Sequence, residues 1–285
     1  MALNAHEELV RLRRAGMSVV LCTVVRTHGS TPRKAGAAMV VSARGLEAGT
    51  IGGGRVENEV LATAQEMLAT GVADTKLVRY HLTHELAMCC GGEMEVFLEL
   101  APPPPLLVVC GGGHVARALV PLAKTVGFLP VVIEDLAELV APGHFAEDIR
   151  VIDSFDVGDW DLCLDESTCV VVVTRDHATD FRLLEQLLDV QLGYFGLIGS
   201  RRKIEMFRRR LEHRGRSLER WPSVHAPIGL HIGAQTPEEI AVSIVAELIS
   251  VRAEARRSGS VGNATRLEPD RTIRRLSDKE TQEPS

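Results

Sequence analysis

The chain has 285 residues, of which 45% are hydrophobic and 25% are charged. These values are typical of soluble globular proteins and exclude wholesale disorder and a collagen-like or coiled-coil composition. The 32 Lys and Arg against 38 Asp and Glu give a net charge of −6, the wrong sign for a chain whose whole surface binds nucleic acid. We therefore expect no nucleic-acid partner.

The cysteine content and the hydropathy pattern indicate a cytoplasmic protein. Six cysteines are spread along the chain without a CxxC pair, which favours a reducing compartment over a disulfide framework or a structural zinc site. The amphipathic start, MALNAHEELVRLRR, does not have the pattern of a signal peptide. No apolar stretch approaches the roughly 20 residues of a membrane helix, so we expect no membrane partner.

Residues 1–100 are predicted to form a small mixed α/β domain. A helix capped by Asn4 and Glu7 comes first, and strands are expected at 18–25 and 37–41. A helix at 56–69 and strands at 75–82 and 93–100 complete the domain. Residues 101–105 read APPPP, which is typical of a stiff linker between domains.

Residues 106–257 alternate strand-like and helical segments. Strands are expected at 106–110, 129–135, 149–153, 168–174 and 194–198, with helices at about 114–126 and 180–189 and a last one from Thr236 to about Arg257. Continuous Val and Ile runs with intervening helices predict a Rossmann-like, doubly wound parallel sheet. Residues 258–285 lack apolar periodicity and are expected to form a disordered tail.

A glycine-rich turn opens the second domain. Gly111, Gly113 and Ala116 follow the first strand at dinucleotide-binding spacing: Gly111 permits a tight turn, Gly113 lets the backbone approach a pyrophosphate, and Ala116 lets the helix pack closely. Glu134 and Asp135 end the second strand, where an acid binds ribose hydroxyls and repels a 2′-phosphate. This favours NAD or another adenine nucleotide over NADP. The alternative is a Rossmann sheet without a ligand.

Two segments of the first domain suggest an anion site. Gly52, Gly53 and Gly54 precede a helix and can turn their N–H groups toward an anion, and Arg55 adds a guanidinium. Upstream, the segment 28–34 adds hydroxyls and cations, namely Ser30, Thr31, Arg33 and Lys34. The alternative is that the glycines only turn the chain and the charges are solvated.

Cys89 and Cys90 stand directly before Gly91 and Gly92. Thiolates are soft ligands and nucleophiles, and the glycines leave room for a bulky ligand at the sulfur. Adjacent cysteines fit a structural zinc site poorly. The alternative is a pair of reduced, partly buried thiols.

Two further segments of the second domain carry possible chemistry. Arg175 and His177 follow a strand at its carboxyl end, where doubly wound sheets place ligands. If the protein were an NAD-dependent oxidoreductase, these two would be its acid/base and anchoring residues. Residues 201–220 hold nine basic and three acidic side chains, which indicates either a solvated helix face or a surface for an acidic partner.

Seven motifs, taken together, resemble the xanthine dehydrogenase accessory factor family (XdhC/CoxI). In chain order they are GSTPRKAG, GTIGGGRVENE, CCGGEMEV, GGGHVARAL, TRDHATD, GLIGSRRK and PIGLHIGAQTPEEIAVSI. The resemblance implies a maturation factor rather than an enzyme with its own turnover reaction. Such a factor binds the molybdenum cofactor (molybdopterin), holds it while a cysteine desulfurase replaces an oxo ligand of molybdenum with a sulfido ligand, and helps insert it into the apo-form of a molybdenum hydroxylase. The resemblance also implies a homodimer.

The resemblance also implies roles for particular residues. Cys90 would be the first candidate for contact with the cofactor or its molybdenum, and Cys89 the second. The pterin phosphate would be held by Ser30, Thr31, Arg33, Gly52, Gly53, Gly54 and Arg55. A nucleotide, or the nucleotide end of a dinucleotide cofactor, would be bound by Gly111, Gly113, His114 and either Glu134 or Asp135.

Overall fold

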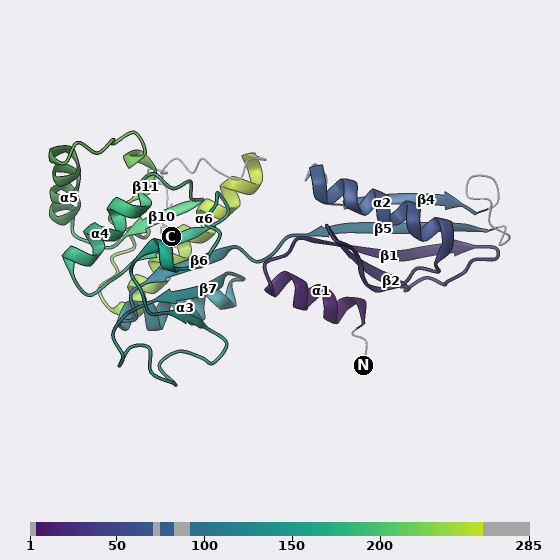
Figure 1. The fold of residues 1–285 in the computed structure, drawn as a ribbon, viewed down its shortest axis with the longest axis horizontal. Helices are drawn as coiled ribbons and strands as arrows, with labels where there is room; N and C mark the ends of the chain where they lie inside the picture. Colours follow the sequence, from purple (N-terminus) through teal and green to yellow (C-terminus); the bar gives the residue numbers. More distant parts are fainter. Residues whose placement is uncertain (1–3, 71–74, 83–91, 259–285) are drawn as a thin grey trace, which may run out of the picture. The chain divides into compact units, whose positions relative to one another are not determined.

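A computed structural model describes residues 4–70, 75–82 and 92–258 (Figure 1). The chain divides into two compact units, residues 1–104 and residues 105–285, which we describe separately. The first ends shortly after strand β5 (Glu93–Ala101), and the second begins shortly before strand β6 (Leu106–Cys110).

Unit 1 is a five-stranded antiparallel sheet with strand order β3-β2-β1-β5-β4. Besides β5, its strands are β1 (Val19–His28), β2 (Ala38–Ser42), β3 (Gly45–Gly49) and β4 (Thr75–His81). Strand β3 is absent from the sequence prediction because Gly-Leu-Glu-Ala-Gly has neither an apolar run nor buried alternation. The helices of unit 1 are α1 (Ala5–Arg14), which has the predicted capping box of Asn4 and Glu7, and α2 (Gly54–Thr70).

Helix α2 covers one face of this sheet. Alternate residues of β5 are buried because a strand presents every second side chain to the same face. Helix α2 buries side chains three or four residues apart, which form one stripe along a helix. The two sets meet in one core, which includes Met94, Val96 and Leu98 of β5 and Val56, Val60 and Ala64 of α2.

Unit 2 contains a six-stranded parallel sheet with order β11-β10-β9-β6-β7-β8, which confirms the predicted Rossmann-like fold class. The strands after β6 are β7 (Leu129–Ile133), β8 (Arg150–Ile152), β9 (Cys169–Val172), β10 (Tyr194–Leu197) and β11 (Val224–His225). The order reverses between β6 and β9. Ligands bind doubly wound sheets at the carboxyl ends of the strands beside such a reversal.

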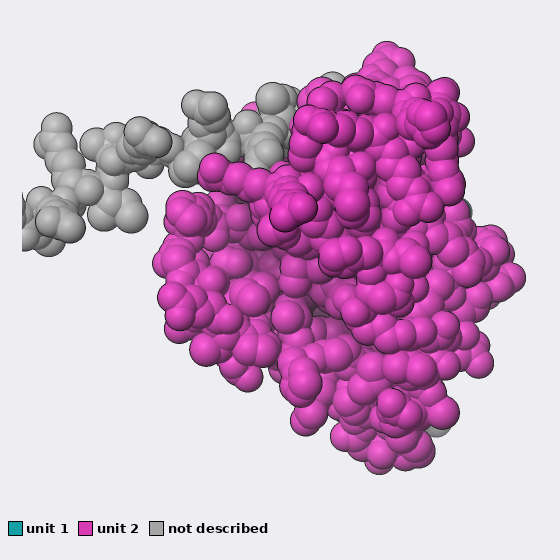
Figure 2. Space-filling view, turned by 90° about the vertical axis from the view of Figure 1, so that its left-hand side faces the viewer, with its two compact units in different colours: residues 1–104 teal, residues 105–285 magenta. Residues whose placement is uncertain are grey.

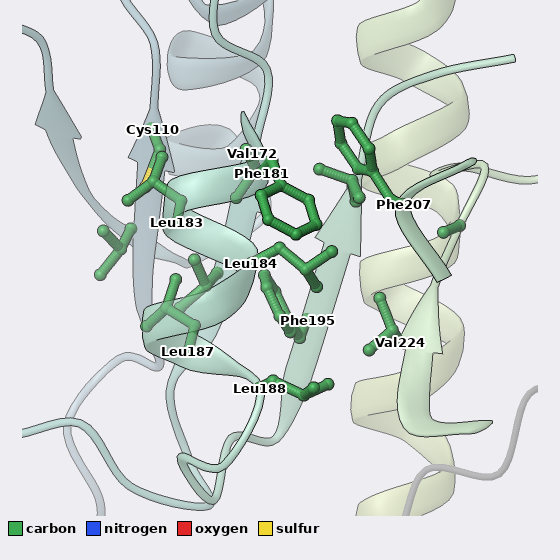
Figure 3. Packing of buried hydrophobic residues seen from close by; sticks show 14 of the residues in the cluster. Cys110, Val172, Phe181, Leu183, Leu184, Leu187, Leu188, Phe195, Phe207 and Val224 are labelled. Carbon is green, nitrogen blue, oxygen red and sulfur yellow. The ribbon is translucent and has the colours of Figure 1, made fainter. Parts of the chain in front are cut away.

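Helices cover both faces of the parallel sheet. Helices α3 (His114–Thr125) and α6 (Pro237–Ser258) pack on one face, and α4 (His177–Leu187) and α5 (Arg201–His213) pack on the other. Figure 3 shows Phe181 and Leu184 of α4 near Phe207 of α5 and Phe195 of β10, with α6 behind the strands. Figure 2 shows one face of unit 2 in a space-filling view.

Helix α4 and strand β11 of unit 2 differ from the prediction. Helix α4 begins at His177 rather than near Asp180, because the Asp176 carboxylate accepts hydrogen bonds from the amides of Ala178 and Thr179 and caps the helix earlier. Strand β11 is only two residues long, too short for a period-2 pattern. None of the helices in the described part of the chain has the length and apolarity needed to cross a bilayer.

Candidate functional site

The glycine turn of unit 2 lies at the carboxyl edge of the parallel sheet, where the loops after β6 and β9 meet. Gly111 has a φ of +118°, and a Cβ atom there would lie 2.5 Å from the Val173 carbonyl oxygen. Any side chain would therefore strain the backbone and collide with the neighbouring strand. This position requires glycine, which agrees with the tight turn expected from the motif.

The Glu134 carboxylate is enclosed by four hydrogen-bond donors. One oxygen accepts from the Gly112 amide at 2.8 Å, and the other accepts from the amides of Asp135 and Leu136 at 3.0 and 3.1 Å and from Arg175 Nη1 at 2.7 Å. The residue is 1% exposed. A carboxylate with this many donors has little capacity left for ribose hydroxyls. Glu134 therefore fixes the glycine turn from within the protein.

His144 holds the same turn from the other side. Its Nε2 lies 2.8 Å from the Gly112 carbonyl oxygen, so both ends of the Gly112 residue are held by side chains. His144 comes from the loop between β7 and β8, 32 positions further along the chain. Sequence reasoning misses it because nothing near His144 marks it as a partner of the turn.

Arg175 bridges the ends of two strands that are not neighbours. Its Nη1 lies 2.7 Å from Glu134 and 2.8 Å from Asp135, and β6 lies between the strands that these residues follow. The hydrogen bond and charge of Arg175 lower the pKa of Asp135. The Asp135 side chain is 42% exposed, so it is the acid of this pair that remains within reach of a ligand.

The N-terminus of α3 is open. Gly113 is the N-cap residue, and a Cβ atom built on it would meet nothing within 4 Å. His114 is exposed, whereas Ala116 is fully buried against the core, as expected for close helix packing. Free N–H groups at an open helix N-terminus fit a phosphate group. The start of α3 is thus suited to the pyrophosphate of a nucleotide. The Glu134 carboxylate, by contrast, is poorly suited to bind the ribose.

A buried ion pair lies beneath the start of α4 and α5. Lys203 donates to the Asp180 carboxylate and, at 2.9 Å, to the Ile198 carbonyl oxygen, and Thr174 Oγ1 donates to Asp180 at 2.6 Å. The pair links the ends of β9 and β10 to both helices. His177, at the first position of α4, is exposed and makes an edge-on ring contact with Phe207 at 6.3 Å between centroids.

Most of the basic residues at 201–220 are engaged within unit 2. Arg208 and Arg209 pair with Glu205, and Arg214 pairs with Glu185. Arg210 lies over the Phe181 ring with 4.1 Å from its Cζ to the centroid. These contacts favour a self-neutralised helix face over a surface for an acidic partner.

Two connections of unit 1, the one between β1 and β2 and the one between β3 and α2, meet at one end of the strands. Gly92, the last residue of the β4–β5 connection, lies beside the first of them. A Cβ atom on Gly52 would lie 2.6 Å from Pro32 Cγ, so the turn before α2 packs directly on the β1–β2 connection. A Cβ atom on Gly92, at the end of the β4–β5 connection, would lie 2.3 Å from the Ser30 carbonyl oxygen. The motifs around Ser30 and Gly52 are thus neighbours in space, and the last residue of the CCGG motif lies beside Ser30.

The glycine turn of unit 1 already holds an anion, the Glu57 carboxylate. One Glu57 oxygen accepts from the amides of Ile51 and Gly53, both at 3.1 Å, and from the Thr50 hydroxyl at 2.6 Å. Burial raises the pKa of Glu57, but these hydrogen bonds outweigh it and hold the pKa below its usual value. The acid in the first turn of α2 was the available sequence signal, because acids are favoured at a helix N-terminus.

The side chains proposed to hold a phosphate differ in their surroundings. Thr31 Oγ1 donates to the Arg33 carbonyl oxygen at 2.9 Å, which makes the threonine part of the turn. Ser30, Arg33 and Arg55 are exposed, and neither arginine forms an ion pair within the described residues. Gly53 and Gly54 have φ values of +74° and +65°. The two arginines are therefore available to an anion at this edge.

Cys89 and Cys90 lie outside the described residues, so their role stays a prediction. Burial raises the pKa of the Cys22 and Cys169 thiols to about 12, and it raises that of Cys110 still further. Such thiols are poor metal ligands. Across residues 4–70, 75–82 and 92–258, no group of three or more His, Cys, Asp and Glu side chains is placed to hold a metal ion.

Models of one protein family match both units of the chain. A model of the XdhC and CoxI family matches residues 12–81, and a model of the XdhC Rossmann domain matches residues 107–248. The chain belongs to the XdhC and CoxI family. The match to the Rossmann-domain model contains the glycine turn of unit 2, Arg175 and the Asp180–Lys203 pair. The match over residues 12–81 contains the glycine turn of unit 1 that holds Glu57.

Three curated relatives extend over most of this family member. YqeB of Escherichia coli K12, a protein described as uncharacterized, is 32% identical over 259 residues, and the match covers 89% of this chain but 47% of YqeB. The chain thus spans about half the length of that relative. A Bacillus subtilis protein described as a probable xanthine dehydrogenase subunit is 24% identical, with 87% of this chain and 98% of the relative covered. The E. coli molybdenum cofactor insertion chaperone PaoD is 26% identical, with 84% and 85% covered.

A solved structure shares the fold of this XdhC and CoxI family member. A crystal structure described as a xanthine dehydrogenase from Bacillus halodurans superimposes with a TM-score of 0.51 at 22% identity. The match covers 90% of this chain and 98% of the other. At this identity the likeness shows the fold alone.

Proposed function

We propose that this protein is a molybdenum cofactor chaperone for a molybdenum hydroxylase such as xanthine dehydrogenase. Membership of the XdhC and CoxI family supports the proposal, as does the similarity to a relative named as a molybdenum cofactor insertion chaperone. The chaperone holds the cofactor as cargo and has no turnover reaction of its own.

One observation carries the proposal: the turn before α2 packs on the β1–β2 connection of unit 1, and Gly92, the residue before β5, packs on that connection too. Gly52 packs on Pro32, and Gly92 packs on Ser30, so the two motifs proposed for phosphate lie next to the point where the CCGG motif ends. Molybdopterin carries a phosphate and a metal bound by sulfur, and therefore needs cations and a soft ligand close together.

Arg33 and Arg55 are the residues proposed to bind the pterin phosphate. Both are exposed: Arg33 lies on the β1–β2 connection, and Arg55 lies in the first turn of α2, directly after the turn that packs on that connection. Guanidinium groups suit phosphate oxygens. Because Glu57 fills the turn, Gly52, Gly53 and Gly54 act by shaping it rather than by giving all their N–H groups to the cargo. Cys90, and then Cys89, remain the proposed contacts of the cofactor itself.

The Rossmann unit is proposed to bind a nucleotide, either the nucleotide end of a dinucleotide cofactor or an adenine nucleotide such as NAD. The open Gly113 at the start of α3 supports a phosphate contact, and the half-exposed Asp135 supports a ribose contact. His114 is exposed beside this helix end and completes the proposed contacts.

The proposed partners follow from the proposed task. A cysteine desulfurase exchanges one oxo ligand of the bound molybdenum for a sulfido ligand, and the apo-subunit of the hydroxylase then receives the cofactor. We also propose a cytoplasmic location, because the dithiolene of the cofactor and the proposed thiol contact both require a reducing environment. Two copies of the chain are proposed to form a homodimer.

Cofactor retention tests this function directly. The purified chain is mixed anaerobically with free molybdenum cofactor and passed over a gel-filtration column, and the protein peak is assayed for molybdenum and pterin. We expect both to co-elute with the wild type and to be lost from Cys90→Ala. Cys163→Ala is the matched control because Cys163 is an exposed free thiol in unit 2. Equal retention by both variants would remove Cys90 from the site.

The alternative function is an NAD-dependent oxidoreductase that uses Arg175 and His177. Arg175 is engaged by Glu134 and Asp135 and so does not offer a free guanidinium to a substrate, which makes this the weaker candidate. Absence of molybdenum and pterin from the wild-type peak, together with bound adenine dinucleotide, would favour it over the chaperone.

A further inference from the structure

The outward face of α6 carries an apolar stripe. Val242, Ala246, Ile249 and Ala253 follow one another in steps of four, three and four residues, the spacing of a coiled-coil seam. At 3.6 residues per turn their side chains fall within about 60° of the helix circumference. Val242 is 48% exposed and Ile249 is 38% exposed, so the stripe does not face the core of unit 2.

The same face has no charge over its central three turns. Between Ile240 and Ser250 the one ionisable residue is Glu247, which is buried. Its carboxylate accepts from the Tyr194 hydroxyl at 2.6 Å and the Gly229 amide at 2.7 Å, which sets the rotation of α6 against the sheet. Solvent-facing sides of helices are normally charged or polar, so a long uncharged face indicates a surface that is covered.

A neighbouring loop that packs on α6 also exposes apolar side chains. The Leu230 amide donates to the Ser243 carbonyl oxygen of α6 at 3.1 Å, which holds the loop against the helix. Leu230 is 39% exposed and Ile232 is 54% exposed. Two more large apolar side chains are thus exposed on the segment that packs on α6.

The ends of α6 carry opposite charges. Glu238 is exposed in the first turn, and Arg257 is exposed in the last turn. Neither forms an ion pair with another described residue. By contrast, Arg208 and Arg209 on α5 are paired within their own helix. The free charges of α6 therefore flank the apolar stripe, with the acid at one end and the base at the other.

These positions are self-complementary under a two-fold axis. An axis that passes between positions 247 and 248 turns the stripe onto itself in the antiparallel direction and sets a large side chain against a small one at each contact. It pairs Val242 with Ala253, Ala246 with Ile249, and Glu238 with Arg257.

We propose that α6 is the surface through which two copies of this chain pair, with their helices antiparallel about this two-fold axis. The pattern fits a second copy because a two-fold interface uses the same patch on both partners, and one patch must then hold both members of each pair. Alanine at two of the four stripe positions lets the helix backbones approach closely. This inference identifies the surface of the proposed homodimer and does not depend on which cofactor the protein carries.

The oligomeric state of the full chain in solution tests the proposal. By light scattering after gel filtration, we expect the wild type to have twice the 31.0 kDa of the chain. Ile249→Glu places a charge in the centre of the stripe and is expected to weaken self-association about 100-fold or more. Met206→Glu is the matched control, because Met206 is a large apolar residue that is 48% exposed, against 38% for Ile249, but lies on α5, and it should leave the dimer intact.

A charge exchange tests the antiparallel direction. Glu238→Arg and Arg257→Glu should each weaken the dimer, and the two substitutions in one chain should restore it, because each then meets its partner across the axis. A monomeric wild type, or a dimer that survives Ile249→Glu, would overturn the surface. A double variant no better than either single variant would overturn the two-fold arrangement. Molybdenum retention is measured on the same samples, so failure of the cofactor function is seen separately.

Discussion

The Gly112 amide donates a hydrogen bond to the Glu134 carboxylate at 2.8 Å, so the acid after the second strand of the Rossmann unit supports the glycine turn. In the usual nucleotide site, the acid after this strand binds ribose. Here Asp135, the next residue, is the exposed acid, and Arg175 holds both. The two neighbouring carboxylates are thus expected to have different roles.

Exchanging each acid for its amide separates these roles. Glu134→Gln puts an NH2 group among donors at a buried site and should destabilise unit 2 by about 2–3 kcal/mol. Asp135→Asn changes an exposed pair and should alter stability by less than about 1 kcal/mol, but it should weaken adenine dinucleotide binding. Urea unfolding followed by tryptophan fluorescence reports unit 2, because Trp160 and Trp221, the two tryptophans, both lie there. Calorimetric titration measures nucleotide binding. If Glu134→Gln were as stable as Asp135→Asn but lost more binding affinity, the assignment of Asp135 as the ribose contact would be wrong.

Two glycines of the turn should respond in opposite ways. Gly113→Val meets open space at an ordinary φ of −73°, so stability should change by no more than about 0.5 kcal/mol while nucleotide binding is lost. Gly111→Ala is strained at φ +118° and collides with Val173, so it should destabilise unit 2 by about 2 kcal/mol or more. Thermal unfolding and calorimetric titration of both variants check this. Equal nucleotide affinity in Gly113→Val and the wild type would exclude the turn as a phosphate site.

The stability of unit 1 should fall in acid because of Glu57. Its pKa is lowered in the folded protein by the donors around it, despite burial, so the folded state favours the ionised form more than the unfolded state does. The stabilisation is therefore complete above the unfolded pKa of about 4.3 and is lost as the pH falls through the lower folded value. Scanning calorimetry of the wild type and Glu57→Gln should show a difference at pH 7 that shrinks toward pH 3. A constant difference would mean that the Glu57 charge does not matter.

The buried Lys203–Asp180 pair should show strong coupling. Lys203→Met leaves the Asp180 carboxylate buried without its cation and should cost about 3–5 kcal/mol. Adding Asp180→Asn to this variant should recover part of the loss, because the remaining polar group is uncharged and still able to meet the Thr174 hydroxyl. Urea unfolding followed by tryptophan fluorescence measures both. Additive losses in the double variant would show that the two side chains are not energetically coupled.

Much of the fold follows from local patterns in the sequence. Buried Val and Ile runs, glycine at Gly111 and the capping residues at Asn4 and Thr236 act over a few residues, so their effect can be predicted without the rest of the chain. The same reasoning misses β3, whose residues do not favour extended backbone, and β11, which is too short to show a pattern. Both form because a neighbouring strand supplies hydrogen-bond partners.

The residue types of the candidate sites were predictable, but their partners were not. Both glycine turns are visible in the sequence, yet only the tertiary structure places Glu57 in one and Glu134 and His144 at the other. A carboxylate is a potential ligand contact until its hydrogen bonds are counted, and those donors come from residues up to 41 positions away. Sequence by itself determined which chemical groups are present and which short segments turn or extend. The tertiary structure decided which of those groups are already satisfied by the protein, because hydrogen bonding and burial depend on neighbours in space.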